Sequence, residues 1–339
     1  MKAAVFYGKE DLRIEELPVP TPGAGEVLLR VRACGICGTD VHIYHGDEGA
    51  APTPVGTVLG HEFAGEVVAI GEGVTDMQIG DRVCADPNEL CGKCAYCLGG
   101  IGHYCTGMNG YGTTKNGGFA EYCVIPRTQV YHIGKDTSFE MAAMTEPVAC
   151  CLHGIDMCDI AAGDTVAVIG GGMIGLLMLQ LAALRGAGKL ILIEPIAEKR
   201  EIARRLGADL CIDPLTEDVQ TVLKQNNITR ISTVIECVGR VNTMEMAIAI
   251  AGVHATVMLF GLTAPAEELT VRPFEIFQKE LTIRASFINP DTQARAWALI
   301  DGGRLDVSTP VCACEPLERL PEILRNPALR AKGKVIILP

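Results

Sequence analysis

The chain has 339 residues, of which 48% are hydrophobic and 21% charged, a composition typical of a globular protein with about two domains. Its 29 Lys and Arg residues against 41 Asp and Glu residues give a formal net charge of −12. Nucleic acids and anionic membranes are bound by basic surfaces, so this charge argues against both partners, and we expect neither.

The first segments of the chain, from Met1 to about Tyr131, are short and alternate between polar and apolar residues. Val27–Arg32 is one example, and Gly80–Asp81 is one of the turns between such segments. The pattern predicts an antiparallel β region. The apolar start of the chain ends at Gly8, too soon for a signal peptide, and we therefore expect a cytoplasmic protein.

A dispersed set of possible metal ligands lies in and after this region. Cys37, His61 and Glu62 come first, and Glu146 follows later in the chain. A catalytic zinc ion needs three protein ligands and one open position, which a thiolate, an imidazole and a carboxylate would provide. Spacing alone leaves this interpretation open, because a single Cys or His is more often a core residue than a ligand.

A compact run of cysteines follows, with the spacing C-x2-C-x2-C-x7-C. Its members are Cys91, Cys94, Cys97 and Cys105. Four thiolates at this spacing predict a closed, structural zinc site, with an iron–sulfur cluster as the alternative. The remaining ten cysteines have no ligand spacing and are interpreted as small buried hydrophobic residues. They are Cys34, Cys84, Cys123, Cys150, Cys151, Cys158, Cys211, Cys237, Cys312 and Cys314.

From about Asp164 to Phe287 the chain alternates between apolar strands and helices, a pattern that predicts a parallel sheet covered by helices on both faces. The predicted strands are Val166–Ile169, Leu190–Ile193, Thr233–Ile235 and Thr256–Phe260, and the clearest helices are Met173–Arg185 and Ala197–Leu206. The apolar run from Val166 to Leu184 is interpreted as a strand, a glycine turn and a core helix rather than a membrane span. The tail, Asn289–Pro339, should hold a helix near Thr292–Ile300 and a final strand at Val335–Ile337.

The first strand and helix of this region enclose a G-x-G-x-x-G motif. It comprises Gly170, Gly171, Gly172, Met173, Ile174 and Gly175. A strand before and a helix after the glycines are the context of a dinucleotide-binding turn, in which the helix N-terminus faces the pyrophosphate. At the end of the next strand stands Glu194, whose carboxylate can accept the adenosine ribose hydroxyls and would repel a 2′-phosphate. We therefore expect NAD rather than NADP, although Lys199 and Arg200 nearby leave NADP as the alternative.

Taken together, these motifs resemble the zinc-dependent medium-chain dehydrogenase/reductase family over nearly the whole chain. The supporting segments are Cys37–His42, Gly60–Val67, the four-cysteine run, Gly117–Tyr122, Glu146–Pro147 and Gly170–Gly175. The resemblance implies an α/β protein with a GroES-like β-rich catalytic domain and a Rossmann domain with a doubly wound parallel sheet. It places the catalytic domain at residues 1–152, the NAD-binding domain at 153–288, and a C-terminal segment at 289–339 that returns to the catalytic domain.

The resemblance also implies roles for individual residues. Cys37 and His61 match ligand positions of a catalytic zinc ion, which Glu62 or Glu146 would complete, directly or through water. With the four-cysteine site, this makes two zinc ions per chain. Thr39 resembles the hydroxyl that relays the substrate proton toward His42. The implied reaction is oxidation of a secondary alcohol to a ketone, with hydride transfer to the nicotinamide.

The substrate is less constrained than the reaction. Glu146 resembles the polyol branch of the family, which includes sorbitol dehydrogenase, and Asp40–Tyr44 resembles L-threonine 3-dehydrogenase. Sorbitol dehydrogenases carry a Tyr where this chain has Ile43, and both branches carry a late Arg where it has Ile288 and Asn289. We therefore expect a neutral polyol, cyclitol or sugar derivative, bound by hydrogen-bonding groups such as Thr39, Tyr44, Glu146 and Asn289.

Three alternatives remain at this point: an L-threonine 3-dehydrogenase, a butanediol or other secondary-alcohol dehydrogenase, and a non-catalytic, zinc-stabilised nucleotide-binding protein. The partner expected in each enzymatic case is a small hydroxylated molecule. The family resemblance further implies a homo-oligomer, either a dimer or a tetramer.

Overall fold

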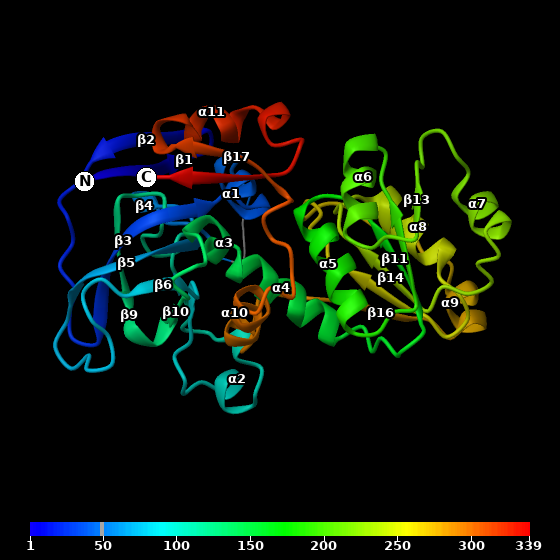
Figure 1. Ribbon diagram of the computed structural model, residues 1–339, viewed down its shortest axis with the longest axis horizontal. Helices are drawn as coiled ribbons and strands as arrows, with labels where there is room; N and C mark the ends of the chain where they lie inside the picture. Colours follow the sequence, from blue (N-terminus) through cyan, green and yellow to red (C-terminus); the bar gives the residue numbers. More distant parts are fainter. Residues whose placement is uncertain (48–50) are drawn as a thin grey trace. The chain divides into compact units, whose positions relative to one another are not determined.

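The computed structural model describes residues 1–47 and 51–339, and the chain divides into two compact units. Residues 1–149 and 290–339 form what we call the β-rich unit, and residues 150–289 form the parallel-sheet unit. The predicted boundaries, after residues 152 and 288, lie a few residues from this division. Figure 1 shows the red C-terminal strand inside the unit that holds the blue N-terminal strands.

The β-rich unit is built on a seven-stranded sheet with the order β10-β6-β5-β3-β18-β17, in which β9 also pairs with β3. Its strands are β3 (Glu26–Gly35), β5 (Glu62–Ile70), β6 (Arg82–Ala85), β9 (Tyr122–Pro126), β10 (Val130–His132), β17 (Val311–Pro316) and β18 (Lys334–Leu338). Along β3, Val27, Leu29 and Val31 enter the main core of the unit while Arg30 faces solvent, the period-2 pattern of a sheet with one buried face.

Smaller elements complete this unit. A three-stranded sheet contains β2 (Asp11–Glu16), β1 (Lys2–Gly8) and β4 (Thr57–Val58), and a two-stranded sheet pairs β7 (Asn88–Glu89) with β8 (Asn109–Gly110). The α-helices are α1 (Gly38–Tyr44), α2 (Ala95–Leu98), α3 (Phe139–Ala143), α10 (Gln293–Asp301) and α11 (Leu320–Arg325), and α4 (Thr145–Asp156) continues into the other unit. Four short 3-10 helices lie at Gly102–Tyr104, Arg127–Gln129, Leu317–Arg319 and Pro327–Leu329.

Three strands from distant parts of the sequence meet at Gly35, the last residue of β3. Gly35 pairs with Glu62 at the start of β5 and with Ile336 of β18, both antiparallel. Helix α1 begins three residues after Gly35, at Gly38. The sheet therefore brings the start of β5, the start of α1 and the C-terminal strand to one place.

The parallel-sheet unit holds six strands in the order β13-β12-β11-β14-β15-β16, and every neighbouring pair is parallel. The strands are β11 (Thr165–Ile169), β12 (Lys189–Ile193), β13 (Leu210–Ile212), β14 (Thr233–Glu236), β15 (Thr256–Leu259) and β16 (Thr282–Ala285). The helices are α5 (Met173–Leu184), α6 (Ala197–Arg205), α7 (Val219–Gln225), α8 (Val241–Ile250) and α9 (Pro273–Lys279). This strand order is that of the Rossmann fold, with the topological switch between β11 and β14, and it confirms the predicted fold class.

The apolar run from Val166 to Leu184 forms β11, the glycine turn and the buried helix α5, as expected. Among the described residues, we find no helix whose length and hydropathy would let it span a membrane.

All fifteen cysteines are thiols, but the expectation that the ten outside the four-cysteine run are all buried is wrong. Cys312 and Cys314 are exposed. Both lie on β17, which is the last strand of its sheet, and their alternate positions on that strand place both side chains on the solvent side. Residue type alone does not reveal which of the two alternating sets of positions on a strand faces solvent.

Candidate functional site

Cys37 is held at the entrance of helix α1 by a carboxylate from the same helix. Cys37 is the N-cap of α1, and its backbone N–H donates to Oδ2 of Asp40 at 2.8 Å. The side chains of Cys37 and Thr39 are also close, with Sγ and Oγ1 3.7 Å apart. The local sequence thus fixes the thiol by a reciprocal capping arrangement.

His61 and Glu62 are presented by the turn that leads into β5. Gly60 adopts a positive φ of 93°, and both following side chains are buried. Ligand atoms of Cys37, His61 and Glu62 all lie within 4.8 Å of one another. The structure therefore brings together three of the four residues predicted for a catalytic metal, although His61 and Cys37 are separated by more than twenty positions in the sequence.

Asp40 is a candidate site residue that the sequence analysis did not identify. Its side chain is fully buried, and its Oδ1 lies 3.4 Å from Nδ1 of His61. A carboxylate facing one ring nitrogen of a histidine favours a proton there and leaves the other nitrogen, Nε2, for a metal. Burial alone would lower the pKa of His61, but the negative charges of Asp40 and Cys37 raise that pKa well above its usual value.

A buried cation completes the surroundings of the cluster. Lys334, the first residue of β18, forms an ion pair through Nζ with Oε2 of Glu62. Burial alone would lower the pKa of Lys334, but the negative charges of Glu62, Cys37 and Glu146 raise it, so this side chain is an ammonium group. Glu146 is buried, but it does not join the three residues whose ligand atoms converge within 4.8 Å.

The cluster fits a zinc ion by its chemistry. Sulfur, imidazole nitrogen and carboxylate oxygen are the three ligand types that zinc accepts, and a set of three protein ligands leaves a position for substrate or water. The pair of Asp40 and His61 has the arrangement that orients a ligating imidazole. Thr39 and His42 stand three residues apart on α1, so both face the same side of the helix. The Nδ1 atom of His42 lies 3.2 Å from Oδ2 of Asp47.

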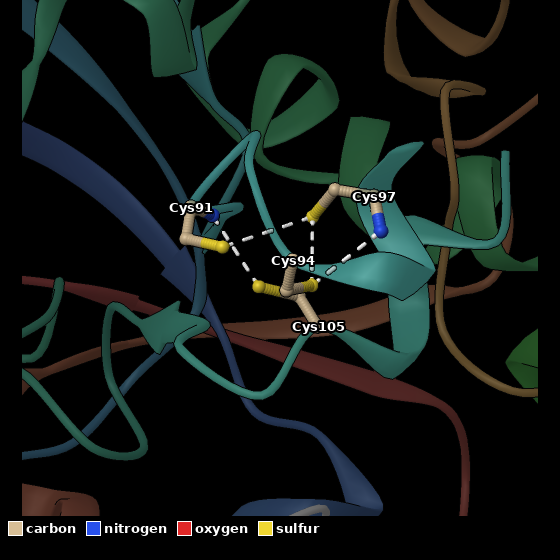
Figure 2. Close-up of side chains that lie close together, drawn as sticks. All are labelled: Cys91, Cys94, Cys97 and Cys105. Atoms are coloured by element: carbon tan, nitrogen blue, oxygen red, sulfur yellow. Dashed lines mark hydrogen bonds between the residues drawn. The ribbon is translucent and has the colours of Figure 1, made fainter. Parts of the chain in front are cut away.

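The four cysteines of the second predicted site also converge. Figure 2 shows the four sulfurs turned toward one another, with Sγ of Cys94 and Cys97 3.5 Å apart and Sγ of Cys91 and Cys97 4.0 Å apart. A tetrahedral zinc site with Zn–S bonds of about 2.3 Å has neighbouring sulfurs about 3.8 Å apart. The observed distances lie on either side of that value, so the four sulfurs have the spacing of a closed zinc site.

The electrostatics of the four-cysteine site also fit a bound zinc ion. Backbone N–H donors of Cys97 and Thr106 lower the pKa of Cys94 to about 6, whereas burial and the neighbouring thiols raise the pKa of Cys97 to about 12. Four clustered thiolates repel one another, and a dication would allow all four to lose their protons. Helix α2 and the following 3-10 helix bury no residue, so the loop lacks a core of its own and needs such a link.

In the parallel-sheet unit, the glycine turn has the geometry of a dinucleotide-binding loop. Gly170 has a φ of 99°, and Gly172 is the N-cap of α5. A Cβ atom at Gly175 would collide with the carbonyl oxygen of Gly170, so this glycine is required for close packing of helix on strand. A Cβ atom at Gly172 would meet nothing within 4 Å, which leaves open space at the helix N-terminus where a pyrophosphate would bind.

Glu194 stands beside this turn. Its two carboxylate oxygens accept hydrogen bonds from the backbone N–H groups of Gly171 (2.6 Å) and Ile196 (2.9 Å). A carboxylate has about four acceptor positions, so two remain for ribose hydroxyls. Arg200 donates to the carbonyl oxygens of Glu194 and Pro195 at 2.7 and 2.8 Å and pairs with Asp213 at 3.1 Å. Arg200, one of the two residues that made NADP an alternative cofactor, therefore uses its guanidinium for bonds within the protein.

Tyr44, expected as a substrate-binding group, has a different position. It belongs to the core of the β-rich unit, where its hydroxyl accepts from the guanidinium of Arg325, an interaction that raises the pKa of Arg325. The helical period explains the error, because Ile43 and Tyr44 both belong to the buried face of α1, whereas Thr39 and His42 are partly exposed.

Two family models match the chain, the first within the β-rich unit and the second mostly within the parallel-sheet unit. Residues 23–135 match the family described as "Alcohol dehydrogenase GroES-like domain", and residues 173–301 match "Zinc-binding dehydrogenase".

Among individual proteins, the chain is 34% identical to D-arabinitol dehydrogenase 1 of Uromyces fabae, covering 99% of this chain and 97% of that one. It is 41% identical to an L-threonine 3-dehydrogenase of Caldanaerobacter subterraneus subsp. tengcongensis over 64% of this chain and 63% of that one. A zinc-binding dehydrogenase of Sinorhizobium meliloti 1021, bound to NADP, has a similar structure, with a TM-score of 0.94, 37% identity, and coverage of 100% of this chain and 99% of the other.

The GroES-like unit and the Rossmann unit, together with the similarity to named alcohol and polyol dehydrogenases, define an alcohol or polyol dehydrogenase. The chain belongs to the zinc-dependent medium-chain dehydrogenase/reductase family. Membership of this family favours zinc over an iron–sulfur cluster, and an enzyme over a non-catalytic nucleotide-binding protein.

Proposed function

We propose that the enzyme oxidises a secondary alcohol of a neutral polyol, cyclitol or sugar derivative to a ketone, with NAD⁺ as the hydride acceptor. The observation that carries the proposal is the convergence of half-buried Cys37 with buried His61 and Glu62, a donor set that suits a catalytic zinc ion. Its similarity to a D-arabinitol dehydrogenase over almost the full length supports a polyol substrate. A second zinc ion at Cys91, Cys94, Cys97 and Cys105 would be structural.

In the proposed reaction, zinc supplies Lewis-acid activation of the substrate oxygen, and the nicotinamide accepts the hydride. The residues of the chain hold and move the proton. Thr39, whose hydroxyl lies beside the Cys37 sulfur, would accept the hydroxyl proton of the substrate and release its own proton toward His42. His42, which is partly exposed and paired with Asp47, is the group that would deliver it to solvent.

The charges around the cluster favour a neutral substrate. An acidic substrate or an amino acid needs a cation for its carboxylate, and the late Arg expected for such a role is replaced by Ile288 and Asn289. The buried cation beside the three candidate metal ligands, Lys334, is already neutralised by Glu62. An L-threonine 3-dehydrogenase is the second candidate, favoured by the 41% identity over part of the chain.

Glu194 supports NAD over NADP. A 2′-phosphate would bring negative charge next to a buried carboxylate, and Arg200 is already bonded to two carbonyl groups and to Asp213. The similar structure from Sinorhizobium meliloti is bound to NADP. The preference for NAD is therefore argued from the residues of this chain alone.

A single experiment tests the function. The zinc-loaded protein is incubated with NAD⁺, and separately with NADP⁺, against polyols, cyclitols, sugar acids, L-threonine and butanediol, with absorbance of the reduced nucleotide as readout. We expect NAD⁺ reduction with one class of neutral hydroxylated compound, lost after chelation and in Cys37→Ser. Turnover of L-threonine instead would refute the neutral-substrate proposal, and faster reduction of NADP⁺ would refute the cofactor preference.

We further propose that two copies of the chain associate through the β16 edge of the parallel sheet. Beside that edge, Phe274 and Phe277 of α9 are 71% and 77% exposed, with ring centroids 6.4 Å apart, and Ile283 of β16 is also exposed. A two-fold axis would pair each edge strand with its own copy and cover these side chains. Light scattering of the wild type and of Phe277→Glu tests this: a dimer or tetramer should become a smaller species, and a monomeric wild type would contradict it.

The expected cytoplasmic location also remains a proposal. It is supported by fifteen cysteines that are all thiols, as is usual in a reducing compartment.

A further inference from the structure

The ion pair between Lys334 and Glu62 has an unusual position for a charged pair. Both side chains are buried, with 7% and 1% of their surface exposed, and one of the two belongs to the three-residue metal cluster. A buried lysine needs a physical reason, because charged groups lose much hydration energy when they are buried. Hydrophobic packing is not that reason, since Val335 and Ile337 of the same strand already fill the core on the opposite face.

The strands build a specific place for this pair. Glu62 and Ile336 both pair with Gly35, and Lys334 stands two residues before Ile336, so all of these positions share one face of the sheet. A Cβ atom at Gly35 would lie 2.8 Å from Cε of Lys334 and closer still to the carboxylate of Glu62. Gly35 has no positive φ, so a glycine is needed here to make room for the ion pair and not for the backbone conformation.

The cation and a bound metal compete for the same group. The carboxylate that pairs with Nζ of Lys334 is the one whose oxygen lies within 4.8 Å of the Cys37 and His61 ligand atoms. While the ammonium group holds it, Glu62 is a weaker ligand, so Cys37 and His61 would bind the metal directly and Glu62 would reach it through water. We infer that Lys334 is a positioning residue. By holding the Glu62 carboxylate in an ion pair beside the metal, it limits direct ligation by Glu62 and leaves a position open for the substrate hydroxyl.

This inference rests on the metal centre of the proposed function, and it makes a prediction about binding as well as about activity. Removing the ammonium group frees the carboxylate and removes a positive charge next to a dication. Both effects strengthen metal binding. We therefore expect Lys334→Met to bind the metal of the Cys37 cluster at least about tenfold more tightly, within the range by which residues behind metal ligands alter affinity.

The test uses the full-length protein with both sites. The metal-free protein is titrated with Co²⁺ and Zn²⁺ against a chromophoric chelator, and the visible spectrum of the Co²⁺ form reports the ligand set. Lys334→Met should show tighter binding and an altered Co²⁺ spectrum, with a slower release of the metal. Lys334→Arg, which restores a cation, should return toward the wild-type spectrum and affinity.

Three further variants make the result specific. Lys2→Met removes a lysine from an exposed ion pair with Glu318 in the same unit, and it should leave metal binding unchanged. Glu62→Gln in the Lys334→Met background should remove the part of the gain that the freed carboxylate supplies and leave only the smaller part due to the lost positive charge. Gly35→Ala keeps every charge but fills the space beneath the pair, and it should alter the Co²⁺ spectrum in the same direction as Lys334→Met.

The outcomes separate the inference from the metal centre itself. Wild-type affinity and spectrum in Lys334→Met, or a gain that persists undiminished after Glu62→Gln, would overturn the positioning role of Lys334. A wild-type protein that binds one Co²⁺ ion at the four cysteines and none at Cys37 would instead refute the metal centre. Melting of each metal-free variant, followed by circular dichroism, shows which variants are folded before metal is added.

Discussion

The buried carboxylate of Asp40 offers a sharp test of the catalytic metal site. It receives the backbone N–H of Cys37 at 2.8 Å and faces Nδ1 of His61 at 3.4 Å, so one side chain orients two proposed ligands. Asp40→Asn keeps the shape but has one acceptor atom instead of two. If the amide oxygen stays on Cys37, the NH₂ group faces His61 and favours the tautomer with the proton on Nε2, which cannot bind a metal.

The size of the effect follows from these contacts. Loss of a group behind a ligating histidine weakens metal binding by about 10- to 100-fold. That range corresponds to about 1.4–2.7 kcal/mol. If the amide turns the other way, its NH₂ group meets the N–H of Cys37 and a hydrogen bond to a charged acceptor, worth about 1.5–3 kcal/mol, is lost. Both orientations therefore predict a loss of similar size.

The assay is a zinc competition titration against a chromophoric chelator, which resolves two ions per chain if both sites are loaded. Asp40→Asn should weaken one of the two and leave the other, held by the four cysteines, as an internal reference. Asp47→Asn is the matched control, because Asp47 carries the same charge, lies just after the same helix and faces His42 rather than His61. Equal zinc affinities in Asp40→Asn and the wild type would refute the orienting role of Asp40.

Three other substitutions address the remaining parts of the site. Thr39→Val removes the proposed proton acceptor without changing shape, so kcat should fall by about 100-fold, typical of general acid–base groups, while zinc content by metal analysis stays unchanged; unaltered turnover would exclude the relay. Cys94→Ser should release one zinc ion per chain and lower the melting temperature, by about 2–4 °C for each kcal/mol lost in a unit of this size, whereas Cys314→Ser, an exposed thiol outside the site, should change neither. Glu194→Ala should raise the ratio of kcat/KM for NADP⁺ to that for NAD⁺ by at least about tenfold, or 1.4 kcal/mol, and an unchanged ratio would show that the carboxylate does not select the cofactor.

Much of the fold follows from local patterns in the sequence. The parallel sheet was predictable because its strands are short apolar runs separated by helices, and the turn at Gly170 interrupts the run where a ligand has to approach. The four cysteines were predictable because their whole ligand set lies within fifteen residues of chain. In both cases the residues concerned lie in one short segment, so the pattern can be recognised without knowledge of the tertiary structure.

Other parts of the site depend on contacts that no local pattern carries. Lys334 reaches Glu62 only because β18 pairs with β3, and nothing in the sequence around Lys334 suggests a buried charge. Arg200 is an ordinary helix-face residue in sequence, and its bonds to backbone carbonyl groups depend on the turn after Glu194. Asp40 is different, because an acidic residue three positions after the Cys37 N-cap is a recognisable capping pattern and could have been found.

The two metal sites differ in a way that explains why one would be catalytic and the other structural. Four thiolates around one Zn²⁺ ion carry a formal charge of −4 against +2, so the four-cysteine centre is anionic and gives no attraction to a hydroxyl oxygen. At the other cluster, Cys37 is an anion, His61 is neutral when it binds a metal, and Glu62 is balanced by Lys334. The thiolate alone then opposes the dication, and the ligand set keeps a net positive charge. Lewis-acid activation of an alcohol needs that residual positive charge. Lys334, by pairing with Glu62, therefore also preserves the electrophilic character of the metal centre.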